Sequence, residues 1–258
     1  MKFIHLSDTH LLARDDLSRP PHAGETLRAV IAEINEYHAD AAICVITGDI
    51  THHGHPEQYD HAVELFATLA MPFIMIPGNH DIREPMLAAF PDVPRDENGF
   101  INHGQTIGGI RFVMLDTIVP DAHHGTLCDA RLDWLKRELA SHRDLPTFLF
   151  MHHPPLDMGL PFLDSIRMDA DAELAAILKD NPQIRHIFLG HLHRPGNGIW
   201  QGIPFNVGGS SQKGEPLDMR HEKEEELVER APLKPMFGIV LTDPSGNVRY
   251  HYETVPFE

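Results

Sequence analysis

The sequence predicts an α/β fold in which mixed β-sheets are covered by helices. Short apolar runs, typical of buried strands, alternate along the chain with stretches whose apolar residues recur at helical spacing. Extra strand pairs in the middle of the chain and at its end indicate mixed sheets in a layered architecture. With 258 residues, the chain is long enough to bury a substantial core.

The first part of the chain shows this alternation clearly. We expect strands at Lys2–Leu6, Ala41–Ile46 and Phe73–Ile76, and helices at Glu25–Tyr37, from Pro56 onward and at Glu84–Ala89. Proline is well suited to the first turn of a helix. In the helix that begins at Pro56, the spacing predicts a buried face of Val63, Phe66 and Leu69.

The second part adds strands to the pattern. Turn residues at Gly108-Gly109, at Gly202 and at positions 243–247 separate pairs of expected strands. Asp129 is a candidate N-cap for a helix whose inward residues are Leu132, Leu135 and Leu139. The expected elements are strands at Phe100–His103, Arg111–Leu115, Thr147–Met151, His186–Leu189, Ile199–Gln201, Ile203–Val207, Met236–Leu241 and Val248–Thr254, and helices at Asp129–Ser141 and Asp171–Lys179.

The chain contains no evident linker or internal repeat, so we expect a single domain over residues 1–258. Residues 212–258 form a C-terminal extension within it, composed of a charged stretch and a β-hairpin. The charged stretch, 212–230, has few large apolar residues and is interpreted as a solvated surface. A lid over the site or an interface with a partner is the alternative for this segment.

Charge and cysteine content limit the functional classes. The formal net charge is −17, from 21 basic and 38 acidic residues, which disfavours long nucleic acids as partners. Two cysteines are too few for a disulfide scaffold, and a reducing compartment is the simplest interpretation. No apolar run is long enough for a membrane span, and the first residues do not resemble a signal peptide. We therefore expect a cytoplasmic protein.

Polar clusters follow several of the expected strands. In open α/β sheets, ligands bind beyond the carboxyl ends of the strands. Side chains that can bind metal are concentrated there, and seven protein ligands are natural for two metals that share a carboxylate, spaced about 3.5–4 Å apart. The candidate ligands are Asp8, His10, Asp49, Asn79, His152, His191 and His193.

The donor types narrow the choice of metal. Carboxylate, amide and imidazole groups without thiolates suit Mn, Fe, Zn or Co. Asp49 could bridge two such ions through its two carboxylate oxygens, and Asn79 supplies a neutral oxygen. The sequence therefore indicates a dinuclear metal centre whose metals it does not identify.

Taken in order along the chain, these polar clusters resemble the motifs of the calcineurin-like metallophosphoesterases. The resemblance extends from residue 3 to about residue 210. The residues that follow Asp49 and those around His152 resemble the motifs of one branch of this family. That branch contains class III cyclic-nucleotide phosphodiesterases and bacterial glycerophosphodiesterases. This resemblance implies a four-layer α/β sandwich of two mixed sheets flanked by helices. It also implies a first metal held by Asp8, His10, Asp49 and His193, and a second held by Asp49, Asn79, His152 and His191.

The resemblance also implies roles around the metals. His80 would face the substrate and either protonate the leaving alkoxide or stabilise charge on the phosphoryl group. Asp81 is the expected partner that orients His80. Asn79, His80 and His193 are expected near the substrate, and His52 is a candidate substrate contact whose alternative is a solvated loop histidine.

Three further sites have simpler interpretations. His153 neighbours a ligand but should point the other way from an extended segment, so a supporting role is an open possibility. Asp116 is interpreted as a structural hydrogen-bond acceptor rather than a catalytic group. The small residues at positions 206–210 should let the backbone pass close to the site.

The function implied by the resemblance is hydrolysis of a small phosphodiester by in-line attack of a metal-bridging hydroxide. Cyclic nucleotides such as cAMP and glycerophosphodiesters are both candidate substrates. The alternatives are a phosphomonoesterase, including a phosphoprotein phosphatase, and a metal-dependent binding module without catalysis. No arginine follows Asp49 directly or adjoins Asn79, which weakens the phosphatase alternative. Relatives are often oligomeric, so we expect a homo-oligomer, a dimer or higher.

Overall fold

A computed structural model describes residues 1–16, 23–169, 172–223 and 232–256, and it contains two mixed β-sheets. The first sheet has the strand order β11-β10-β1-β2-β3, and the second has the order β4-β5-β6-β7-β9-β8. The strands of the first sheet are β1 (Lys2–Leu6), β2 (Cys44–Ile46), β3 (Phe73–Met75), β10 (Met236–Thr242) and β11 (Val248–Thr254). Those of the second are β4 (His103–Ile107), β5 (Ile110–Leu115), β6 (Thr147–Met151), β7 (Ile184–Leu189), β8 (Gly196–Trp200) and β9 (Ile203–Val207).

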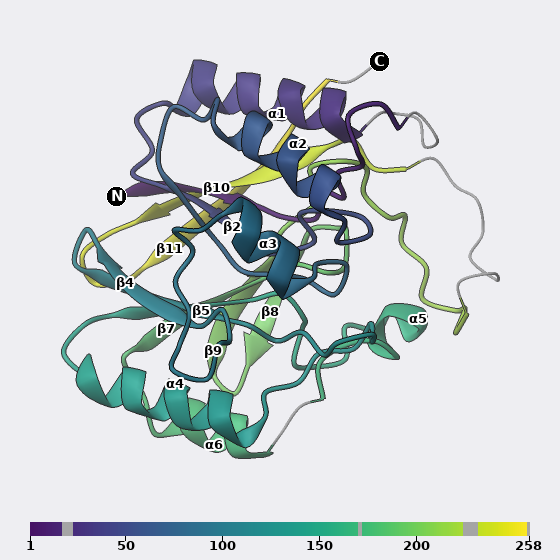
Figure 1. The fold of residues 1–258 in the computed structure, drawn as a ribbon. Helices are drawn as coiled ribbons and strands as arrows, with labels where there is room; N and C mark the ends of the chain where they lie inside the picture. Colours follow the sequence, from purple (N-terminus) through teal and green to yellow (C-terminus); the bar gives the residue numbers. More distant parts are fainter. Residues whose placement is uncertain (17–22, 170–171, 224–231, 257–258) are drawn as a thin grey trace.

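Helices cover the outer face of each sheet. α1 (Ala23–His38), α2 (Pro56–Phe66) and α3 (Arg83–Ala89) pack on the first sheet, whereas α4 (Asp129–Ser141) and α6 (Ala172–Lys179) pack on the second. The result is the expected four-layer α/β sandwich (Figure 1). The short helix α5 (Pro161–Asp164) lies away from these layers and was not expected from the sequence.

Alternation along the strands explains the layering. In β6, Phe148 and Phe150 face the other sheet, whereas Leu149 and Met151 face the helices of the second sheet. β1 does the same in the first sheet, with Phe3 between the sheets and Ile4 under the helices. Aromatic rings dominate the layer between the sheets: the Phe150 and Phe188 rings stack with centroids 4.8 Å apart.

Parallel strands bring the polar clusters to one edge. β1, β2 and β3 run parallel to one another in the first sheet, and β5, β6, β7 and β9 run parallel in the second. All the predicted ligands follow the carboxyl ends of these strands. The C-terminal hairpin β10–β11 adds two strands to the first sheet, with β10 antiparallel to β1.

A few local predictions were wrong. Phe66 is buried as predicted, but Val63 is exposed on α2, because the buried face is centred on residues such as Ala62 and Leu65. The strand expected at Phe100–His103 begins only at His103. Cys128, not Asp129, occupies the N-cap position of α4, and it makes no side-chain capping bond.

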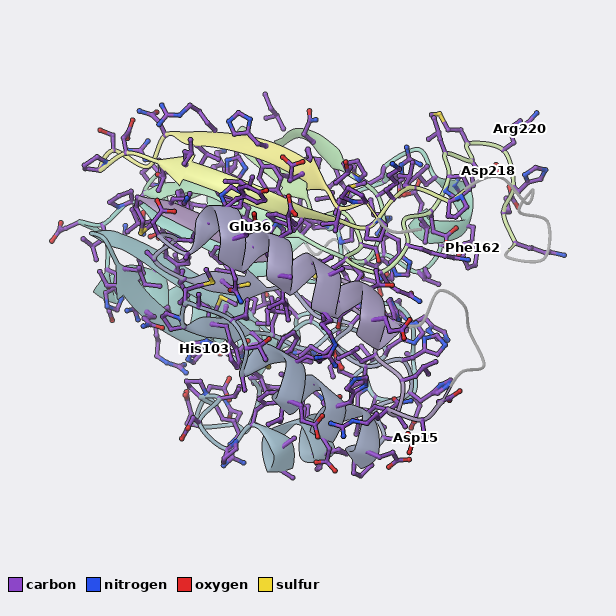
Figure 2. The ribbon with its side chains drawn as sticks, turned by 90° about the horizontal axis from the view of Figure 1, so that it is seen from above. Asp15, Glu36, His103, Phe162, Asp218 and Arg220 are labelled. Atoms are coloured by element: carbon purple, nitrogen blue, oxygen red, sulfur yellow. The ribbon has the colours of Figure 1, made fainter. Side chains whose placement is uncertain are left out.

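The described residues contain no helix long and apolar enough to cross a membrane. Of the charged stretch predicted at 212–230, residues 224–230 lie outside the described residues. Residues 212–223 are described and lie over the same end of the molecule as α5: Figure 2 shows Phe162 of α5 close to Asp218.

Candidate metal centre and active site

The backbone is strained where the candidate ligands leave the strands. Asp8, His10, Asp49, His191 and His193 all have positive φ, between 43° and 72°. L-residues rarely adopt this region, and such strain is typical of functional sites. The turn at each strand end therefore directs these side chains into a shared space between the two sheets' edges.

Two glycines allow the ends of β2 and β3 to approach each other. A Cβ on Gly48 would lie 2.6 Å from the backbone nitrogen of Gly78, and a Cβ on Gly78 would lie 2.3 Å from Oδ1 of Asp49. Only glycine fits at such distances. These glycines thus set the spacing between Asp49 and the loop that carries Asn79 and His80.

The four residues predicted to hold the first metal lie close together. Nε2 of His10 lies 2.8 Å from Nε2 of His193 and 3.4 Å from Oδ2 of Asp49. Nε2 of His193 lies 3.6 Å from Oδ1 of Asp8. The candidate ligand atoms of these four residues lie within 4.8 Å of one another, as metal binding requires.

The second group meets the first at Asp49. Nε2 of His152 is 3.4 Å from Oδ2 of Asp49 and 3.2 Å from Oδ1 of Asn79, and Nδ1 of His191 is 2.9 Å from the same Asn79 oxygen. Oδ2 of Asp49 is therefore equally distant from His10 and His152. The expected bridge through both oxygens differs from this arrangement, because Oδ1 accepts a hydrogen bond from the backbone N–H of His80 (2.9 Å).

The donor set fits a cation. Nδ1 of His152 donates to the carbonyl oxygen of Thr47 (2.7 Å), so the exchangeable proton of the ring is on Nε2, which faces the oxygens of Asn79 and Asp49. A metal ion bound there would replace this proton between the ring nitrogen and the two oxygens. Oδ2 of Asp8 is buried without a hydrogen-bond partner among the described residues, which a metal ion would also satisfy.

The pKa shifts of the buried groups differ between the candidate ligands. Burial alone would lower the pKa of His152, but the Asp49 carboxylate raises it to about 9. Burial lowers the pKa of His10 and of His191 well below the usual value, so both rings are neutral, as metal ligands must be. Burial alone would raise the pKa of Asp49, but the charged His152 ring beside it holds this pKa well below its usual range. The central carboxylate is therefore ionised.

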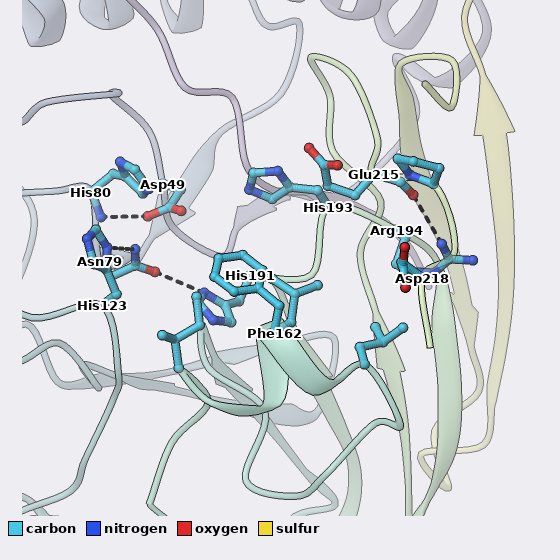
Figure 3. A pocket seen from close by; sticks show the side chains of 14 residues that line it. Asp49, Asn79, His80, His123, Phe162, His191, His193, Arg194, Glu215 and Asp218 are labelled. Carbon is cyan, nitrogen blue, oxygen red and sulfur yellow. Dashed lines mark hydrogen bonds between the residues drawn. The ribbon is translucent and has the colours of Figure 1, made fainter. Parts of the chain in front are cut away.

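A cavity of about 470 Å³ opens beside this centre. Figure 3 shows Asp49, Asn79 and His80 at one end of the view, Arg194 and Asp218 at the other, and Phe162 of α5 between them. The apolar wall comes from the α5 region and comprises Leu160, Phe162, Leu163 and Ile166. Arg194, Glu215 and Asp218 form a polar part of the lining, and Pro216 lies among them in the sequence.

Comparison with known proteins agrees with this geometry. The profile described as calcineurin-like phosphoesterase matches residues 1–195. The chain belongs to this family. Family membership and the candidate metal ligands together identify a site for divalent metal cofactors.

Curated relatives of the family are phosphodiesterases. A probable cyclic nucleotide phosphodiesterase of Rhodopseudomonas palustris is 43% identical over 80% of this chain and 77% of its own length. A probable glycerophosphodiester phosphodiesterase of Arcobacter nitrofigilis is 30% identical over 90% of this chain and 86% of its own. The 3',5'-cyclic adenosine monophosphate phosphodiesterase of Escherichia coli K12 is 29% identical over 78% of this chain and 73% of its own length.

Solved structures share the fold at low identity. A dimetal phosphatase from Danio rerio is similar over 99% of both chains, with a TM-score of 0.66 and 14% identity. A purple acid phosphatase from yellow lupin has a TM-score of 0.70 and 13% identity, over 98% of this chain and 51% of the other. These similarities support the calcineurin-like phosphoesterase fold.

Within this family site, one predicted contact was wrong. The Asp81 carboxylate does not orient the His80 ring: it accepts hydrogen bonds from the backbone N–H groups of Ile50, Thr51 and Gly78 at 3.0–3.1 Å. The carboxylate is buried and fastens the loop after β2 to the loop after β3. Sequence adjacency suggested the pairing with His80, but the turn at Gly78 directs the two side chains apart.

His80 is held by a backbone group instead. Its Nδ1 donates to the carbonyl oxygen of His52 (2.8 Å), and the two rings stack with centroids 5.1 Å apart. His52 also lies against His10, with ring nitrogens 3.3 Å apart. His52 thus supports His80 and His10. It is not one of the described residues that line the cavity.

The remaining predicted residues take structural positions. Asp116 accepts two hydrogen bonds from Arg83 (2.7 and 2.8 Å), which confirms it as a structural acceptor. Ser210 donates to the carbonyl oxygen of Asp8 (2.8 Å), so the small-residue segment does pass directly behind the site. His153 is fully buried, and both of its ring nitrogens have hydrogen-bond partners.

The sequence did not single out several residues that line the cavity. His123, Phe162 and Arg194 come from irregular segments or a short helix, without a periodic signal. Glu215 and Asp218 lie in the extension that was interpreted mainly as solvated surface, and they support its alternative interpretation as a cover over the site. The Asp218 side chain pairs with His221 (2.8 Å), which shapes this cover.

Proposed function

We propose that this protein hydrolyses small phosphodiesters, with 3',5'-cyclic nucleotides such as cAMP as its substrates, at a centre of two metal ions. The observation that carries the proposal is a cavity with two kinds of lining. Its lining includes the candidate ligands Asp49, Asn79, His191 and His193, and it also includes an apolar wall with Phe162. A cyclic nucleotide has a charged phosphodiester and a flat aromatic base, and it matches both kinds of lining.

The predicted ligand sets supply the metal sites of this proposal. Asp8, His10, Asp49 and His193 would hold one ion, and Asp49, Asn79, His152 and His191 the other. Two such ions supply positive charge to the phosphoryl oxygens and lower the pKa of a water molecule. Mn, Fe, Zn and Co all suit these donors.

His80 is the proton donor in this proposal. Because its Nδ1–H donates to the His52 carbonyl, the proton that it can exchange is on Nε2. In the imidazolium form, Nε2–H can be given to the departing alkoxide of the ribose, which is a poor leaving group unless it is protonated. His80 lines the cavity beside Asn79, where the leaving group would lie.

The glycerophosphodiester alternative rests on the relative from Arcobacter nitrofigilis. A glycerol group does not need an apolar wall, so the Phe162 side of the cavity favours a nucleotide. A phosphomonoester would bring a dianion. Arg194 is the only Lys or Arg among the described residues that line the cavity, and its guanidinium donates to the Glu215 carbonyl (3.1 Å). The monoesterase is therefore the weaker alternative.

A substrate panel tests the proposal. Metal-loaded protein is assayed with cAMP, cGMP, glycerophosphoethanolamine, bis-p-nitrophenyl phosphate and p-nitrophenyl phosphate. The proposal expects the highest kcat/KM among natural substrates for a cyclic nucleotide. Preference for the glycerophosphodiester would replace the substrate class, preference for the monoester would overturn the diesterase, and no turnover at all would indicate a binding module. Sizing the same sample by light scattering tests the expected homo-oligomer.

A further inference from the structure

His123 lies in the active-site cavity without having been singled out by sequence motifs. It follows β5 in a loop, and it lines the cavity together with Asn79 and His80. Its ring centroid is 5.7 Å from that of His80. The cavity therefore holds two imidazoles outside the candidate ligand sets, and only one of them has a role in the proposed reaction.

The hydrogen bond from Asn79 fixes the tautomer of His123. Oδ1 of Asn79 faces His191 and His152, so the amide Nδ2 points away from the metal centre, and it lies 3.3 Å from Nδ1 of His123 (Figure 3). An amide nitrogen only donates, so Nδ1 of His123 must accept. The proton of the neutral ring is then on Nε2, which makes His123 a hydrogen-bond donor that lines the cavity.

A buried histidine holds the loop that carries His123. Nε2 of His153 lies 3.1 Å from the carbonyl oxygen of His123, and Nδ1 lies 2.8 Å from Oγ1 of Thr117. A carbonyl oxygen only accepts, so Nε2 of His153 carries the proton and Nδ1 accepts from the threonine hydroxyl. Gly125 makes room for this ring, since a Cβ there would lie 2.5 Å from Nδ1 of His153.

We propose that His123 is a second substrate-binding imidazole, which donates from Nε2 to a non-bridging oxygen of the phosphodiester. Asn79 sets its tautomer, and His153 is a positioning residue that fixes its loop. The inference rests on the proposed function of this cavity. The proposal gives the two histidines different roles. His80 exchanges a proton with the leaving group, whereas His123 only donates a hydrogen bond to the charged phosphoryl oxygen.

The division predicts distinct kinetic signatures. His123→Ala should lower kcat/KM by about 10- to 100-fold, somewhat less than the 10²–10³-fold loss in kcat typical of a buried oxyanion donor, because His123 is exposed. The loss should be the same for cAMP and bis-p-nitrophenyl phosphate, since a non-bridging oxygen is common to both. His123→Gln keeps an acceptor for Asn79 and an N–H donor, and it should recover part of the activity. His124→Ala, at the exposed neighbour outside the cavity, is the matched control.

His153 is tested through a double-mutant cycle. His153→Asn should lower kcat/KM in the wild-type background but have little further effect in the His123→Ala background, because the two residues act on one group. A loss of activity through general destabilisation would instead reduce both backgrounds by the same factor. Metal content, measured by mass spectrometry on all variants, should stay at the wild-type value.

Four outcomes would overturn the inference while leaving the proposed function intact. They are a His123→Ala variant within twofold of a diesterase-active wild type, a loss that is much larger for cAMP than for bis-p-nitrophenyl phosphate, loss of bound metal from His123→Ala, and additive effects in the cycle. A wild-type protein that is inactive on every diester would instead refute the proposed function itself.

Discussion

The ring of His80 is held by the backbone of His52, with 2.8 Å between Nδ1 and the carbonyl oxygen. This bond leaves Nε2 as the only ring nitrogen that can exchange a proton with a substrate. It does not depend on the identity of the His52 side chain, since the acceptor is the main chain. The two histidines therefore make different predictions when each is replaced by alanine.

Replacing His80 removes the proposed proton donor without removing a candidate ligand. His80→Ala should lower kcat by about 10²–10⁴-fold, the range of general acid catalysis. The loss should be greatest for diesters with poor leaving groups, such as cAMP, and smaller for bis-p-nitrophenyl phosphate. Metal content should not change. An emptied metal site in this variant would contradict the assignment of His80 as a residue that does not bind metal.

Replacing His52 tests whether its side chain contacts the substrate. His52→Ala keeps the carbonyl that holds His80 and loses only the stacked ring, so kcat should fall less than about tenfold, as expected for a stacking contact of about 1 kcal/mol. Steady-state kinetics on cAMP and bis-p-nitrophenyl phosphate provide the measurement. A loss as large as that of His80→Ala would show that the His52 ring touches the reacting groups.

Asp49 joins the two ligand groups through Oδ2, which lies 3.4 Å from Nε2 of both His10 and His152. Asp49→Asn removes the negative charge that both groups share. We expect metal content to fall in both sites and kcat to fall by at least about 100-fold, which exceeds the typical effect of groups that merely support ligands. Metal analysis of purified protein checks this, and retention of the wild-type metal content would refute the bridging assignment.

Phe162 forms part of the apolar wall of the cavity. Stacking of a base on an aromatic side chain is worth about 1–3 kcal/mol, so Phe162→Ala should raise KM for cAMP by about 5- to 150-fold. KM for glycerophosphoethanolamine should stay constant, because that substrate has no base. Tyr37→Ala, at an exposed aromatic on α1, is the control. Equal effects on both substrates would exclude base stacking at Phe162.

Buried histidines make stability depend on pH. Burial lowers the pKa of His186 to about 4, and its Nε2 donates to Asn206 (2.9 Å). The unfolded chain takes up this proton near pH 6.5, so His186 favours unfolding as the pH falls from 6.5 towards 4 and has no such effect above 6.5. His186→Gln should make the free energy of unfolding fall less steeply, by about 1.4 kcal/mol per pH unit in that window. An unchanged slope in denaturant titrations would contradict this.

Much of the fold follows from local sequence. The strands β1, β6 and β11 and the helix α4 have the predicted bounds. β1 and β6 are short apolar runs, β11 follows a strong turn sequence, and the leucines of α4 recur at helical spacing. The face of α2 was not predictable in this way. The buried side chain of Tyr59 donates to Asp81 (3.0 Å) across the loop, a tertiary contact that decides which face turns inward.

The residues of the site also differ in how well the sequence predicts them. The candidate ligands could be identified because each ends a parallel strand, and parallel strands share an edge. Asp81 and His123 could not be placed, because the path of a loop between elements decides their contacts. Asp81 binds three backbone N–H groups that its own motif does not indicate, and His123 is fixed by the distant His153.

The central claim is that two metal ions in this site are needed for the hydrolysis of a phosphodiester. It is tested most directly by titrating manganese into metal-free protein while following the hydrolysis of cAMP. The account predicts no turnover without metal and full activity only when about two ions are bound per chain. Turnover of cAMP by the metal-free protein, or full activity with one ion per chain, would contradict it.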